Sequence, residues 1–98
     1  MKDVLIVISS NPNGGYLYEQ GIEVALNLAD AMTDVTVLAE GEFLRNLDNS
    51  DTNIFTKKLK QCELYDIEVY AEDCRGIEFI REITEQNFAC TFTKVVTF

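Results

Sequence analysis

Apolar residues along the chain follow two patterns, continuous runs and helical stripes. Residues 3–9, "DVLIVIS", form an aliphatic and β-branched run, which is typical of a strand covered on both faces in a parallel sheet. Residues 16–32, "YLYEQGIEVALNLADAM", carry apolar positions at spacings of three and four, which predicts an amphipathic helix. The buried stripe of this helix is predicted to consist of Tyr18, Ile22, Ala25, Ala29 and Met32.

Both patterns recur to the end of the sequence. Strands are predicted over residues 34–40 and 66–71, with one or two more in residues 90–98, and helical segments over residues 41–47, 54–64 and 74–86. The inward positions of the last two helices are predicted to be Phe55, Leu59 and Cys62, and then Ile77, Ile80 and Ile83. Alternating strands and helices predict an α/β fold, a three-layer sandwich with a mainly parallel sheet of about five strands. We expect a single domain over residues 1–98.

Composition excludes several classes of function. Seventeen acidic and eight basic residues give a net charge of −9, which repels phosphate backbones, so we expect no direct nucleic-acid binding. Histidine is absent, which removes the commonest general base and metal ligand, and the carboxylates show no metal-ligand spacing. We therefore expect no metal and no cofactor. Because no apolar run approaches the roughly 20 residues that span a bilayer, and no secretory signal is recognised, we expect a cytoplasmic protein without a membrane partner.

Three cysteines are present, and the predicted elements separate them. Cys62 lies on the helix that leads into a strand and Cys74 lies beyond the end of that strand, so roughly 15 Å or more separates them. A disulfide needs Cα atoms within about 7 Å, so the two are not expected to form a redox pair. Cys62 falls on an apolar stripe, and Cys90 alternates with Phe88 and Phe92 in a predicted strand. Both are expected in the core.

Cys74 is the candidate catalytic residue. It follows the carboxyl end of a predicted parallel strand, where α/β folds place their ligand sites, and the guanidinium of Arg75 would favour its thiolate. Glu72 and Asp73 would oppose the thiolate. The alternative interpretation is that Cys74 is a partly buried loop cysteine without a chemical function. Both interpretations stay open.

Two further features suggest binding surfaces. The loop Ser9–Gly15, "SSNPNGG", occupies a place where a phosphate could be bound, but it lacks GxGxxG and GxxxxGK[ST], which favours a plain connection over a small-ligand site. A 98-residue α/β domain has few residues with which to cover its sheet, so association is expected. Aromatic and aliphatic residues after the first two strands are the predicted interface, namely Tyr16, Tyr18, Phe43 and Leu44.

Several stretches carry a family resemblance: "VLIVISSNPNGG", "YEQGIEVALNLADAM", "LAEGEFLRNL", "KLKQCELYDIEVY" and "KVVTF". Together they cover nearly the whole chain, which resembles the DsrE/DsrF-like sulfur relay family and most closely its TusC (DsrF-type) branch. The resemblance implies a noncatalytic subunit that forms a hetero-oligomer with TusB-like and TusD-like partners. Such a complex passes persulfide sulfur toward tRNA wobble-uridine 2-thiolation or serves dissimilatory sulfur metabolism. The alternatives are a homo-oligomeric persulfide carrier that uses Cys74, and a small-ligand module that uses Ser9–Gly15.

Overall fold

One parallel sheet organises the structure, a computed structural model that describes residues 2–84 and 88–98. Its strands lie in the order β4-β3-β2-β1-β5, and every neighbouring pair within the described residues is parallel. The strands are β1 (Lys2–Ile8), β2 (Val35–Ala39), β3 (Glu68–Ala71), β4 (Ile80–Glu82) and β5 (Phe92–Thr97). The helices are α1 (Leu17–Asp30), α2 (Gly41–Arg45), α3 (Ile54–Leu59), α4 (Gln61–Leu64) and the 3₁₀ helix η1 (Phe88–Thr91). The predicted α/β fold with a parallel sheet of about five strands is confirmed.

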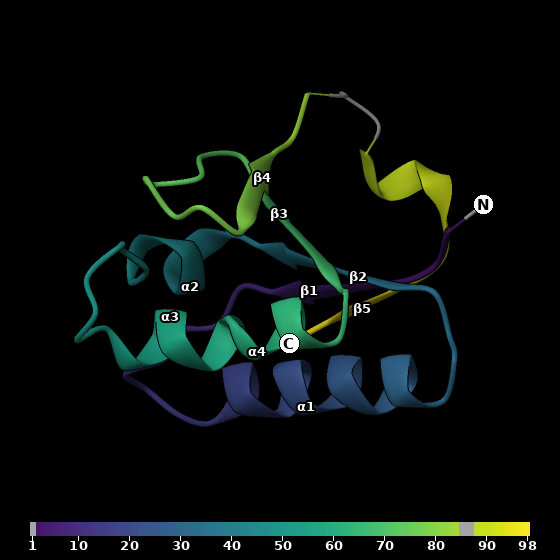
Figure 1. The fold of residues 1–98 in the computed structure, drawn as a ribbon, viewed down its shortest axis with the longest axis horizontal. Helices are drawn as coiled ribbons and strands as arrows, with labels where there is room; N and C mark the ends of the chain where they lie inside the picture. Colours follow the sequence, from purple (N-terminus) through teal and green to yellow (C-terminus); the bar gives the residue numbers. More distant parts are fainter. Residues whose placement is uncertain (1, 85–87) are drawn as a thin grey trace.

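Strand order determines which face each connection covers. The chain steps from β1 to β2 to β3 in one direction across the sheet, and right-handed crossovers then place α1, α3 and α4 on the same face. The return from β4 to β5 runs the other way, and η1 lies on the opposite face (Figure 1). One layer is therefore built of helices, whereas the described part of the other contains only a short 3₁₀ turn.

Strand β1, which lies between β2 and β5, is buried on both faces, as its continuous apolar run predicts. Ile6 and Ile8 belong to the main core beneath the helices, and both are 0% exposed. Leu5 and Val7 belong to a smaller cluster on the other face, together with Phe92. Among the described residues, no helix is long and apolar enough to cross a membrane.

Helix α1 buries most of the predicted stripe but ends before Met32. Its side chains Tyr18, Ile22 and Ala25 are buried, whereas Met32 is 92% exposed, so the prediction for Met32 is wrong. Met32 adopts a left-handed φ of 68° and its amide donates to the Ala29 carbonyl, while the next amide reaches the Leu28 carbonyl. This Schellman arrangement ends the helix and turns Met32 outward.

The helix predicted over residues 54–64 is present in two pieces. Lys60 separates α3 from α4, and Leu59 and Cys62 on either side of it are buried as predicted. Helix α3 begins at a side-chain cap, in which the Asn53 Oδ1 accepts the Thr56 amide at 2.9 Å.

The helix predicted over residues 74–86 is wrong across the described part of that range. Arg75 and Gly76 both have positive φ, at 52° and 74°, which starts a tight turn where a helix was expected. Ile80 then begins β4 and pairs with Val69 of β3. Spacing by three suits a helix, yet Ile77 and Ile80 reach the same core from a turn and a strand. Residues 85 and 86 of the prediction lie outside the described residues.

Candidate functional site around Cys74

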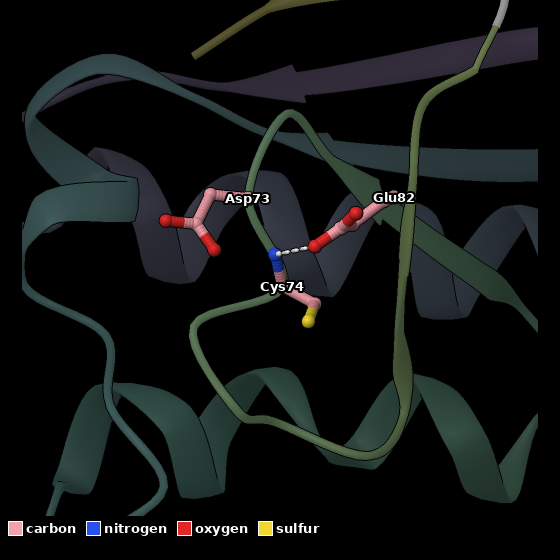
Figure 2. A group of neighbouring side chains, drawn as sticks. All are labelled: Asp73, Cys74 and Glu82. Atoms are coloured by element: carbon pink, nitrogen blue, oxygen red, sulfur yellow. Dashed lines mark hydrogen bonds between the residues drawn. The ribbon is translucent and has the colours of Figure 1, made fainter.

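Cys74 lies at the carboxyl edge of the sheet, where its position after the third strand predicted it. Strand β3 ends at Ala71, and Ala71 is in register with Glu82, the last residue of β4. The two strand ends therefore bring the Cys74 loop and Glu82 together, and the Glu82 Oε1 accepts the Cys74 amide at 3.5 Å (Figure 2). The Cys74 side chain is half-buried and packs against the main core.

A tight turn follows Cys74 and sets its orientation. The Ile77 amide donates to the Cys74 carbonyl at 2.8 Å, and the two intervening residues have positive φ, which is the geometry of a type I′ turn. Gly76 suits such a position because it has no side chain to strain. The Asp73 Oδ1 accepts the Arg75 amide at 2.9 Å and braces the entry to the turn.

Arg75 ties this turn to another part of the chain. Its Nε donates to the Leu47 carbonyl at 2.7 Å, across 28 positions of sequence. Sequence reasoning expected this guanidinium to favour the Cys74 thiolate, whereas its described hydrogen bond anchors the turn to the segment after α2. The contact gives Arg75 a structural task that its place beside a cysteine did not indicate.

Negative charge surrounds the Cys74 thiol. The Sγ and one carboxylate oxygen each from Asp73 and Glu82 lie within 4.8 Å of one another, and both carboxylates are exposed (Figure 2). One sulfur and two oxygen donors are a ligand set that a divalent cation can accept, but exposed acidic groups also gather without an ion.

The other two cysteines differ from Cys74 and from each other. Cys62 is 0% exposed, as predicted, and burial raises the pKa of its thiol from 9.0 to about 12. Cys90 was expected in the core, and this is wrong because it lies in η1 and is exposed. A 3₁₀ turn does not alternate its side chains between two faces as a strand does, so the spacing from Phe88 to Phe92 does not bury Cys90.

The predicted interface residues do not form one surface. Tyr16 is 74% exposed and Leu44 is half-buried, which leaves both available for an interface. Tyr18 and Phe43 are 6% and 0% exposed, and their rings stack with centroids 5.7 Å apart. The prediction that Tyr18 and Phe43 belong to an interface is therefore wrong. Both residues belong to the core, where large aromatic rings are removed from water.

The loop Ser9–Gly15 uses many of its amides internally. The Ser9 and Ser10 amides both donate to the Phe98 carbonyl, at 2.9 and 3.2 Å. The Gly14 amide donates to the Asn11 carbonyl and the Asn13 amide to the Asn11 side chain. These four amides donate within the chain, so they are not free to bind a phosphate in this conformation.

Sequence reasoning missed Glu82 and Leu47 as neighbours of the Cys74 turn. Glu82 was assigned to a helix, so its register with Ala71 could not be anticipated. Leu47 contributes a backbone carbonyl, and no side-chain pattern marks such an acceptor.

Comparisons with known proteins bear on the fold. No protein-family model matches the sequence, and no curated protein matches it. Among solved structures, the chain is similar to the crystal structure of the ychN protein from E. coli, which has a DsrE-like fold. The similarity has a TM-score of 0.73 and covers 100% of both chains, at 19% sequence identity. The chain has a DsrE-like fold. At this identity the similarity concerns the fold alone.

Proposed function

We propose that the chain is a noncatalytic, assembly-forming subunit of a cytoplasmic sulfur relay complex of the TusC/DsrF type. The observation that carries the proposal is the environment of Cys74 within a DsrE-like fold. Its thiol is half-buried beside two carboxylates, and the described hydrogen bond of Arg75 anchors the turn to the Leu47 carbonyl. The hydrogen bonds that hold this turn in one shape suit a structural role within an assembly.

Co-purification from the native cell tests this function. The chain should be recovered in a stable complex with TusB-like and TusD-like proteins, and its deletion should lower tRNA thiolation or sulfur oxidation. Recovery without any DsrE-like partner, combined with normal sulfur metabolism in the deletion strain, would defeat the proposal.

A second candidate, a persulfide carrier that uses Cys74, is favoured by the position of the residue. Cys74 lies at the carboxyl edge of a parallel sheet, where α/β proteins place their reactive groups, and it is not fully buried. Incubation with a cysteine desulfurase and cysteine, followed by mass spectrometry of peptides, distinguishes the candidates. A carrier should gain sulfur on Cys74, whereas the noncatalytic subunit should gain none there. Cys90 is an exposed internal control for nonspecific sulfur addition.

A further inference from the structure

A cleft of about 610 Å³ lies beside the Cys74 turn, and the proposed function does not use it. Three segments form its walls: residues 49–51, the part of residues 56–63 that carries Lys57, Lys60 and Glu63, and residues 76–79. The volume lies in the range of small-molecule binding sites. A neighbouring hollow of about 400 Å³ shares Glu63, Glu78 and Phe79 with it.

The turn after Cys74 fixes one wall of this cleft. The Ile77 amide is bonded to the Cys74 carbonyl, and Arg75 holds the same turn to the Leu47 carbonyl. Gly76 faces Asn49 so closely that an added Cβ would lie 3.3 Å from the Asn49 Nδ2. These contacts give the wall a defined shape before any ligand binds. A preformed wall lowers the entropy cost of binding.

Charges of both signs line the cleft. Lys57, Lys60 and Glu63 lie on the wall formed by the α3–α4 segment, and Asp51 and Glu78 lie on the other two walls. None of these five side chains makes an ion pair within the described part of the chain. A polyanion would meet three carboxylates and a protein of net charge −9, whereas a ligand with one charge of each sign finds a partner for both.

We propose that this cleft binds a zwitterion of amino-acid or dipeptide size. Its carboxylate pairs with the ammonium groups of Lys57 and Lys60, and its amino group pairs with the carboxylates of Glu63 and Glu78. The apolar part of the ligand packs on Phe79, which is half-buried at the junction of the two hollows. Charge-assisted pairs at both ends select against analogues that carry only one charge.

Titration of the ¹⁵N-labelled chain with glycyl-leucine, followed by amide chemical shifts, tests the proposal without any partner protein. Shifts are expected at residues 76–79 and at Lys57 and Lys60. N-acetyl-glycyl-leucine, which lacks the amino charge, and glycyl-leucine amide, which lacks the carboxylate, should each bind about tenfold or more weakly. The result is independent of complex formation, so it can fail while the proposed function stands.

Paired variants check each end of the ligand. Replacing both Lys57→Gln and Lys60→Gln, or both Glu63→Gln and Glu78→Gln, should weaken glycyl-leucine binding about tenfold or more. Lys58→Gln is the matched control because Lys58 lines a different groove, against α1, and should leave binding unchanged. The proposal is overturned by the absence of shifts in the cleft at tens of millimolar dipeptide, by equal binding of either single-charge analogue, or by unchanged binding in either double variant.

Discussion

Replacing Cys62 by serine tests the core through a pH dependence of known sign. The Cys62 thiol is 0% exposed, and burial raises its pKa from 9.0 to about 12 because a thiolate would be desolvated there. The folded chain therefore keeps this proton at a pH where the unfolded chain has lost it.

The size of the effect follows from linkage. Between pH 9.0 and about 12 the native state binds more protons at Cys62 than the unfolded state, so the free energy of unfolding falls as pH rises. The contribution is fully present well below pH 9 and is lost as the pH approaches the folded pKa. At pH 10, one unit above the unfolded pKa, the loss for this group alone is on the order of 1 kcal/mol, since one pKa unit corresponds to roughly that free energy.

Urea denaturation under reducing conditions, followed by circular dichroism, measures this pH-dependent change in the free energy of unfolding. At about pH 7, Cys62→Ser should cost roughly 1–3 kcal/mol, because a hydroxyl replaces the thiol among apolar neighbours. Near pH 10 the difference in unfolding free energy between wild type and variant should shrink by roughly 1 kcal/mol, because serine does not ionise and the other groups cancel in the difference. Cys90→Ser, at an exposed site, should follow the wild type. If the free energies of unfolding of wild type and Cys62→Ser keep a constant difference up to pH 10, the reasoning is refuted.

Three other substitutions test the packing and the turns. Phe43→Ala should cost about 3–5 kcal/mol in urea denaturation while exposed Tyr16→Ala stays within about 0.5, and equal losses would remove Phe43 from the core. Asn53→Ala should cost about 1 kcal/mol because α3 loses its cap, and an unchanged melting temperature would show the cap to be dispensable. Gly76→Ala should cost about 1 kcal/mol or more, because Gly76 has a φ of 74° that alanine adopts only with strain. Gly15→Ala is the control and should be neutral, because an added Cβ would meet nothing within 4 Å. Similar melting curves for the two variants would contradict the turn geometry.

The sheet was largely predictable because its strands carry unambiguous patterns. A continuous apolar run predicted β1, and β-branched segments predicted β2 and β5. Strand β4 was not predictable in the same way, since Ile77 and Ile80 are spaced as in a helix. What excludes a helix is the pair of left-handed residues before them, and Arg75 in this conformation is uncommon enough that sequence gives little warning.

Aromatic residues explain why the interface was misplaced. Phe43 lies in α2 shortly after β2, and Tyr18 lies in the first turn of α1, and at either place both a partner and the core can cover a ring. The structure closes the core over them by stacking Phe43 on Tyr18 and placing Phe55 edge-on against Tyr18. These two ring contacts join α2, α1 and α3. Side-chain periodicity within one helix cannot reveal a contact among three helices.

The location of Cys74 and its chemical environment have different physical origins. Parallel pairing of β3 brings any residue shortly after Ala71 to the carboxyl edge of the sheet, whatever its side chain. The environment depends on a turn with two left-handed residues, on the Arg75 contact and on the register that presents Glu82. A chain can therefore share the DsrE-like fold and the edge position while differing in the groups that surround the residue placed there. For that reason the sulfur content of Cys74 after incubation with a desulfurase, and not the fold, decides between the two proposed functions.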